Sequence, residues 1–259
     1  MPLTKHLEQG QLLYFTRNPN AITVSENNYY RWLAFDDVIQ SVMNKRHPSR
    51  LTLPHHFAIL QPLMTFRPAT ITEFGLGGGN IARFIRSLSL EIKYQVIESD
   101  LKVIHCHQQF FNTEQAYIQI EHENAMRWLR QQRLKQAPIN VDYHWFIYDI
   151  FQHSDVHVSA TNEALYLLIE QLTVTQALTV NLPFVSAVEL SHLVTLIHAT
   201  QPQHRLTLYH VPHHQNKVLH LLPGLEHQQK EYVCPVPTKQ IKYWQRYHQL
   251  FNIKWPTEK

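Results

Sequence analysis

The chain has 259 residues and a mass of 30.7 kDa, which is enough for one large α/β domain or two small ones. Its 44% hydrophobic and 17% charged content excludes a disordered chain. We find no apolar run of membrane-spanning length and no signal-peptide pattern. A net charge of +3 and two cysteines argue against a nucleic-acid surface, a disulfide framework and a four-cysteine zinc site. We therefore expect a cytoplasmic protein that has neither a membrane nor a nucleic acid as partner.

The first 52 residues have the pattern of a small β appendage. Short β-like runs at 11–16, 21–25, 30–35 and 38–42 alternate with turn residues such as those at 18–20. Such alternation predicts one or two β-hairpins. Residues 46–50 follow as a connector, so we assign residues 1–52 to the appendage and connector.

From residue 53 onward, strand and helix patterns alternate. Such βαβ units predict an α/β, Rossmann-like domain over 53–259, with a mostly parallel sheet covered on both faces. A final strand pair, 205–211 and 217–222, predicts an antiparallel edge. The other expected strands are 69–74, 92–97, 116–120, 141–147 and 177–181, and the expected helices are 80–90, 101–111, 124–136, 162–172 and 187–199.

Glycine supplies the sharpest clue. Four of the chain's six glycines, Gly75, Gly77, Gly78 and Gly79, lie between a predicted strand and a predicted helix. Glycines there allow a ligand to approach the backbone, and bare amides at a helix start attract anions. Glu98 ends the next predicted strand, 21 residues beyond Gly77, where an acid accepts ribose hydroxyls. We therefore expect a nucleoside pocket.

Two kinds of nucleoside fit this loop. Residues 77–82 satisfy the dinucleotide pattern G-x-G-x-x-G/A, a weak signal on its own. The spacing of Glu73, Gly75, Gly77 and Gly79, with an acid at the head of the loop, instead resembles the S-adenosylmethionine-dependent transferases. An NAD enzyme is the weaker alternative because the sequence shows no set of residues typical of hydride transfer beside the loop.

Five motifs, taken in their order along the chain, point to one family among the S-adenosylmethionine-type transferases. These are the segment 35–41, the Gly-Leu-Gly-Gly-Gly loop at 75–79, Ile-Glu-Ser-Asp at 97–100, Glu-Asn-Ala at 123–125 and the segment 142–149. In order and spacing they resemble the polyamine aminopropyltransferases, or spermidine synthase-like proteins, which share the methyltransferase-type fold. The resemblance covers roughly 29–225. It implies no permanently bound cofactor, with decarboxylated S-adenosylmethionine or S-adenosylmethionine as co-substrate, and a possible homodimer.

On the donor side, the resemblance implies a role for each matching position. Glu98 matches the ribose-binding acid, Gln40 the glutamine of the appendage, and Gly75, Gly77, Gly78 and Gly79 the nucleoside loop. Asn80 stands where an acid commonly meets the aminopropyl amine, and Asn124 where an aspartate caps the adenine amino group. Replacing aspartate by asparagine keeps the shape but removes the charge.

On the acceptor side, the resemblance implies a cationic amine as the second small molecule. Asp149 matches the usual proton acceptor, whereas Gln152 replaces the second aspartate of that motif. Asp155 remains nearby as a further candidate for binding the amine. His55 or His56 stands where the family has a tyrosine. These replacements leave two alternatives open, a methyltransferase that uses S-adenosylmethionine itself and a non-catalytic protein that retains the fold.

The 19 histidines raise the question of metal binding. The best cluster in the sequence is formed by His210, His213, His214 and His220, around a predicted turn. No strict ligand spacing such as H-E-x-x-H occurs. We therefore expect scattered histidines and no metal site.

Overall fold

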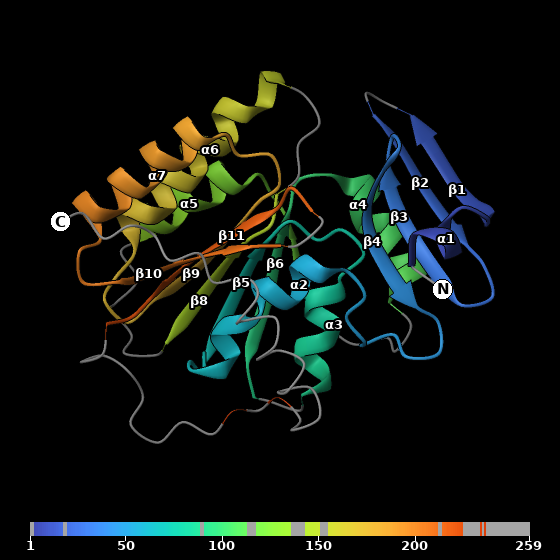
Figure 1. The fold of residues 1–259 in the computed structure, drawn as a ribbon, viewed down its shortest axis with the longest axis horizontal. Helices are drawn as coiled ribbons and strands as arrows, with labels where there is room; N and C mark the ends of the chain where they lie inside the picture. The colour runs from blue at the N-terminus through green and yellow to red at the C-terminus, as the bar shows by residue number, and fades with distance from the viewer. Residues whose placement is uncertain are drawn as a thin grey trace.

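A computed structural model describes residues 3–17, 20–88, 91–112, 118–135, 143–150, 155–211, 214–224, 234 and 236, with backbone alone at 4, 133–135 and 155–162. These residues form two sheets (Figure 1). The N-terminal sheet is antiparallel, with strand order β1-β2-β3-β4. Its strands are β1 (Gln11–Arg17), β2 (Ala21–Glu26), β3 (Tyr30–Phe35) and β4 (Val38–Asn44), and α1 (Leu3–Leu7) packs beside β3. The expected β appendage is confirmed.

The second sheet has seven strands in the order β10-β11-β9-β8-β5-β6-β7. The strands from β9 to β7 run parallel, whereas β11 is antiparallel to both β9 and β10. The expected parallel sheet with an antiparallel edge is therefore confirmed. Its strands are β5 (Thr70–Phe74), β6 (Lys93–Glu98), β7 (Gln119–His122), β8 (His144–Tyr148), β9 (Ala177–Leu182), β10 (Arg205–His210) and β11 (Lys217–Leu222).

Helices cover both faces of this sheet. On one face, α5 (Ala125–Lys135), α6 (Asp155–Gln171) and α7 (Ala187–Thr200) lie side by side (Figure 1). On the other lie α2 (Pro54–Ile59), the 3-10 turn η1 (Gln61–Met64), α3 (Asn80–Ser87) and α4 (Leu101–Cys106), which continues into the π-helical turn η2 (His107–Phe111). Successive side chains of β8 alternate between the faces: Trp145 packs in one hydrophobic cluster and Phe146 in the other.

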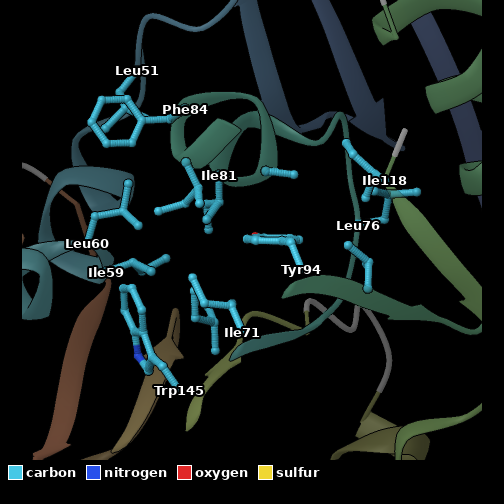
Figure 2. Packing of buried hydrophobic residues seen from close by; sticks show 14 of the residues in the cluster. Leu51, Ile59, Leu60, Ile71, Leu76, Ile81, Phe84, Tyr94, Ile118 and Trp145 are labelled. Atoms are coloured by element: carbon cyan, nitrogen blue, oxygen red, sulfur yellow. The ribbon is translucent and has the colours of Figure 1, made fainter. Parts of the chain in front are cut away.

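The appendage shares a core with the larger sheet. Val24 and Leu33 of the appendage, both fully buried, belong to the same hydrophobic cluster as Ile71 and Ile81. Figure 2 shows this cluster around the ring of Tyr94, with side chains from α2, α3, β5, β6 and β8 pointing toward one another. The shared core holds the appendage firmly against the glycine loop.

Several elements differ from expectation, among them α6, α3 and β7. Helix α6 begins at Asp155 instead of 162. The sequence pattern placed the start too late, because the β-branched Val156 and Val158 lower the helix propensity of the first turns. Helix α3 ends at Ser87 instead of 90, and β7 begins at Gln119, later than the expected 116.

No helix in the described part of the chain is both long enough and apolar enough to span a membrane.

Candidate functional site

A cavity of about 1000 Å³ opens at the carboxyl ends of β5, β6, β8 and β9, the edge where α/β sheets bind ligands. The appendage and α2 form the opposite wall. The expected site residues that line it are Gln40, Gly75, Gly77, Asn80, Glu98, Asn124 and Asp149. Gly78 and Gly79 belong to the same loop but are not among the lining residues. Gln152 lies outside the described residues, and the structure describes only the backbone of Asp155.

The loop from Gly75 to Gly79 requires glycines, because its backbone has positive φ angles and lies close to other parts of the protein. Gly75 has a φ of +93°, and a Cβ placed there would lie 2.4 Å from the Asp149 carbonyl oxygen. A side chain at this position would therefore push β5 away from the end of β8. Gly77 and Gly79 have φ values of +49° and +70°, which also favour glycine.

The appendage binds this loop through Ser41. The Gly78 amide donates a hydrogen bond of 2.7 Å to the Ser41 Oγ, and both groups are buried. A Cβ on Gly78 would lie 2.8 Å from the Ser41 Cβ. One amide of the loop is therefore used to hold β4, and that amide is not available to an anion.

Asn80, the first residue of α3, is buried and has protein partners for both polar atoms. Its amide nitrogen donates to the Val42 carbonyl at 2.9 Å, and its oxygen accepts from the Arg83 guanidinium. Arg83 also donates to the carbonyl oxygens of Gly78 and Pro48. Asn80 thus fastens α3 to the appendage, while its expected contact with the donor stays a prediction.

Glu98 lies at the end of β6 with 9% of its surface exposed. Its carboxylate accepts hydrogen bonds of 2.9 Å from the Leu76 and Asp100 amides. Burial raises the pKa of Glu98, and these two amides partly offset the shift. A carboxylate has about four acceptor positions, so Glu98 can hold the glycine loop and still accept a ribose hydroxyl.

Asn124 is exposed at the start of α5. Its side-chain oxygen accepts from the Met126 and Arg127 amides at 3.0 and 3.4 Å, as a helix N-cap does. The expected bond from an adenine amine therefore depends on the second lone pair of that oxygen. In the appendage, the Gln40 amide donates to the Val38 carbonyl at 3.3 Å.

Asp149 follows β8 directly and is held by two asparagines. The Asn181 amide donates to Asp149 Oδ1 at 2.7 Å, and the Asn216 amide donates to the Asn181 oxygen at 2.9 Å. All three residues line the cavity. This relay fixes the orientation of the carboxylate and leaves Oδ2 for a ligand.

Helix α2 brings His55 and His56 to Asp149. One side-chain ligand atom from each of the three residues lies within 4.8 Å of the other two. Burial lowers the pKa of both histidines; Asp149 partly opposes this for His55, and the charges of His55 and Arg83 add to it for His56. The sequence did not reveal this cluster, because Asp149 is remote from the two histidines along the chain.

A network of polar side chains holds α2 in place. The His220 Nε2 donates to the Ala58 carbonyl at 3.0 Å, its Nδ1 lies 2.8 Å from the Thr179 hydroxyl, and Trp145 donates to the same hydroxyl at 2.9 Å. Both ring nitrogens of His220 are thus occupied. Of the histidines around the turn after β10, His210 is exposed, His214 lines the cavity and its charge adds to the effect of burial in lowering the pKa of His55, and His213 lies outside the described residues.

Glu73, the acid at the head of the glycine loop, was given no role among the predicted site residues. It is 2% exposed and lines the cavity. Burial, helped by the charges of Asp149 and Glu98, raises the pKa of Glu73 to about 8, although Tyr94 and Arg83 act in the opposite direction. Glu73 is therefore mainly neutral at pH 7 and cannot supply a full charge to a cationic ligand.

The cavity is acidic. Its lining contains Glu73, Glu98, Asp100, Glu123 and Asp149, and no Lys or Arg is present among the lining residues that the structure describes. Arg83 is directed to carbonyl oxygens and Asn80 behind the loop. Such a lining favours cationic ligands over anionic ones.

We compared the chain with known proteins. No family model matches it. Over 86 residues it is 34% identical to the polyamine aminopropyltransferases of two Neisseria meningitidis strains, of serogroups A and B, and this stretch spans 32% of the chain and 33% of each relative.

The fold is similar to that of solved spermidine synthases. A probable spermidine synthase from Corynebacterium glutamicum matches with a TM-score of 0.61 and 12% identity over 92% of this chain and 86% of that protein. A spermidine synthase in complex with the transition-state analogue AdoDATO matches at 0.60 and 13% identity, over 90% and 88%. The chain resembles the spermidine synthase-like proteins.

The same fold extends to methyltransferases. Human methyltransferase-like protein 13, solved in complex with SAH, matches with a TM-score of 0.57 and 14% identity, over 80% of this chain and 96% of that protein. The chain therefore has the Rossmann-like, methyltransferase-type fold expected from its sequence.

Proposed function

We propose that this spermidine synthase-like protein binds decarboxylated S-adenosylmethionine and transfers its aminopropyl group to an amine. The observation that carries the proposal is the cavity itself, in which the glycine loop and Glu98 line one part and Asp149 another. Glu98 would accept the ribose hydroxyls and Asn124 would contact the adenine. Gln40 and Ser41 come from the appendage, so residues 1–52 would supply one wall of the site.

The charge of the lining supports the decarboxylated donor. Ordinary S-adenosylmethionine carries a carboxylate, which needs a cation or free amides as a partner. The described lining holds acidic groups but no Lys or Arg, and the Gly78 amide already binds Ser41. The decarboxylated donor carries only positive groups in the same part of the molecule and fits these surroundings better.

The transfer would be a nucleophilic displacement. The acceptor nitrogen attacks the aminopropyl carbon bonded to the sulfonium, the carbon–sulfur bond breaks, and its electron pair stays on sulfur as methylthioadenosine leaves. The proton lost by the nitrogen passes to Asp149, whose orientation Asn181 fixes. A nearby carboxylate serves this step both as base and as counter-ion of the ammonium product.

The first experiment is a calorimetric titration of methylthioadenosine into the protein. Both sulfonium donors contain this nucleoside, so it tests the pocket without presupposing the reaction. We expect micromolar binding that weakens at least about tenfold in Glu98→Gln, which loses one of the hydrogen bonds to ribose. Glu91→Gln, a change at an exposed surface position, is the matched control and leaves binding unchanged.

Turnover is measured next, with decarboxylated S-adenosylmethionine and putrescine. Formation of methylthioadenosine that disappears in Asp149→Asn supports the transferase. Methyl transfer from S-adenosylmethionine, with the decarboxylated donor inert, would establish the methyltransferase alternative instead. No nucleoside binding at millimolar concentration would favour a non-catalytic protein that retains the fold.

A further inference from the structure

Two imidazoles and one carboxylate meet on the cavity wall, and the proposed transfer uses only the carboxylate. Since the ligand atoms of His55, His56 and Asp149 are at most 4.8 Å apart, a point between them lies within about 2.8 Å of all three. Zinc binds imidazole and carboxylate ligands at about 2.0–2.2 Å. Small side-chain rotations would therefore bring all three groups into bonding distance.

One ring nitrogen of His56, the more buried histidine of this cluster, lacks a hydrogen-bond partner among the described residues. His56 is 3% exposed, and the nitrogen in question is its Nδ1. A buried imidazole nitrogen without a partner costs free energy, because it has lost water and gained nothing in exchange. A bound cation would satisfy the imidazole, since imidazole is a common metal ligand.

The carboxylate of the cluster is held in the manner of a metal ligand. The Asn181 amide donates to one oxygen of Asp149 at 2.7 Å, and Asn216 in turn holds Asn181. Partners of this kind orient a ligating carboxylate, and their loss typically weakens metal affinity. On the histidine side, the bond from His220 to the Ala58 carbonyl fixes the helix that carries both imidazoles.

We propose that His55, His56 and Asp149 bind a divalent first-row transition-metal ion whose remaining coordination positions open into the cavity. Two imidazoles and one carboxylate, with positions left open, suit Zn²⁺ and Fe²⁺ better than Mg²⁺ or Ca²⁺, which prefer oxygen ligands. The open positions face a cavity of about 1000 Å³, so water or a nitrogen or oxygen atom of a small ligand can complete the coordination.

This site goes beyond aminopropyl transfer, and it restricts that reaction. An ion on Asp149 removes the group that would accept the proton of the amine. Metal and acceptor amine therefore compete for the same carboxylate. If the protein is a transferase, Zn²⁺ inhibits it and higher amine concentration relieves the inhibition.

The test is a titration of the metal-free full chain with Co²⁺, followed by displacement with Zn²⁺. Co²⁺ reports its own coordination through visible absorption, so scattered surface histidines can be distinguished from a defined site. We expect one equivalent with the absorption of a four- or five-coordinate ion. His55→Gln and Asp149→Asn each lower the affinity at least about tenfold, while His192→Gln, which changes an exposed histidine on α7, leaves it unchanged.

Asn181→Ala tests the positioning role separately. It keeps the absorption band and lowers the affinity about tenfold, since the three ligands remain but the carboxylate is no longer oriented. Thermal unfolding of each metal-free variant shows whether it is folded. The proposal is wrong if folded His55→Gln and Asp149→Asn bind Co²⁺ as the unmodified chain does, or if the unmodified chain shows no such band. Because no nucleoside is added, failure of the metal site and failure of the nucleoside pocket are observed independently.

Discussion

Tyr94 donates a hydrogen bond of 2.5 Å to the carboxyl group of Glu73, and both side chains are buried. The pair lies beneath the glycine loop, with Glu73 on β5 and Tyr94 on β6. Figure 2 shows the Tyr94 ring surrounded by aliphatic side chains. This environment disfavours charge, so the carboxyl group takes up a proton on folding.

Glu73 makes the stability of the protein depend on pH. Its pKa rises from 4.5 to about 8 on folding, so between these values the folded chain holds a proton that the unfolded chain lacks. The contribution of Glu73 to the free energy of unfolding therefore falls as pH rises through this window and levels off above about pH 8, while the histidines whose pKa burial lowers act in the opposite direction at its acidic end. Urea unfolding from about pH 5 to pH 9 measures the effect.

Glu73→Gln is the matched variant, because glutamine keeps the volume and stays neutral. We expect the free energy of unfolding of the variant to gain on that of the unmodified protein between about pH 5 and pH 9, and to exceed it at the alkaline end. Tyr94→Phe, which only removes the hydroxyl, lowers stability by about 1–2 kcal/mol. Identical pH profiles for Glu73→Gln and the unmodified chain would contradict the assignment.

The contact between Ser41 and Gly78 predicts a coupling between the appendage and the glycine loop. In Gly78→Ala the new Cβ lies 2.8 Å from the Ser41 Cβ, which we expect to destabilise the protein by about 1–3 kcal/mol. Ser41→Gly removes that neighbour, so adding Gly78→Ala to it costs less. Chemical unfolding of the two single variants and the double variant measures the coupling energy. Additive effects would show that the appendage and the loop do not depend on each other.

The His220 network predicts a link between β11 and α2. In Thr179→Val the hydroxyl between Trp145 and His220 is lost, which takes one hydrogen bond from each of these two buried side chains. We expect a loss of about 1–3 kcal/mol in unfolding free energy. Thr195→Val, on the exposed side of α7, is the control and changes stability by less than about 0.5 kcal/mol. Equal losses in the two variants would contradict the network.

Local patterns predicted most of the fold from the sequence. Alternating apolar residues define β2, a short run of apolar residues defines β3, and the strand entering Gly75 coincides with β5. The glycine spacing and the position of Glu98 also located the cavity, because parallel strands place their carboxyl ends along one edge.

Long-range contacts were not predictable in the same way. His55 and His56 meet Asp149 only because α2 packs against β9 and β11, next to the strand that Asp149 follows, and no spacing along the chain encodes this approach. The burial that makes Glu73 a weak acid likewise arises from Tyr94 and neighbouring elements. For Asn80 the resemblance implied a position next to the donor, and the sequence did not reveal that its side chain bonds to Arg83 and Val42.

The two asparagines that stand in place of acids are expected to respond differently when the acid is restored. Asn124 is exposed at the cavity and caps α5, so Asn124→Asp places a charged acceptor near the expected adenine amine. A charge-assisted hydrogen bond there strengthens methylthioadenosine binding about three- to tenfold. Calorimetric titration of the variant and the unmodified protein measures the change.

Asn80→Asp is the matched comparison, measured with decarboxylated S-adenosylmethionine because its amine is the group that an acid at this position would meet. Both polar atoms of Asn80 already have protein partners, so the new carboxylate pairs with Arg83 rather than with the donor. Donor affinity therefore stays within about twofold, since no new contact to the ligand forms. A tenfold gain in Asn80→Asp would show instead that the side chain turns into the cavity and that the lost acid had held the donor amine.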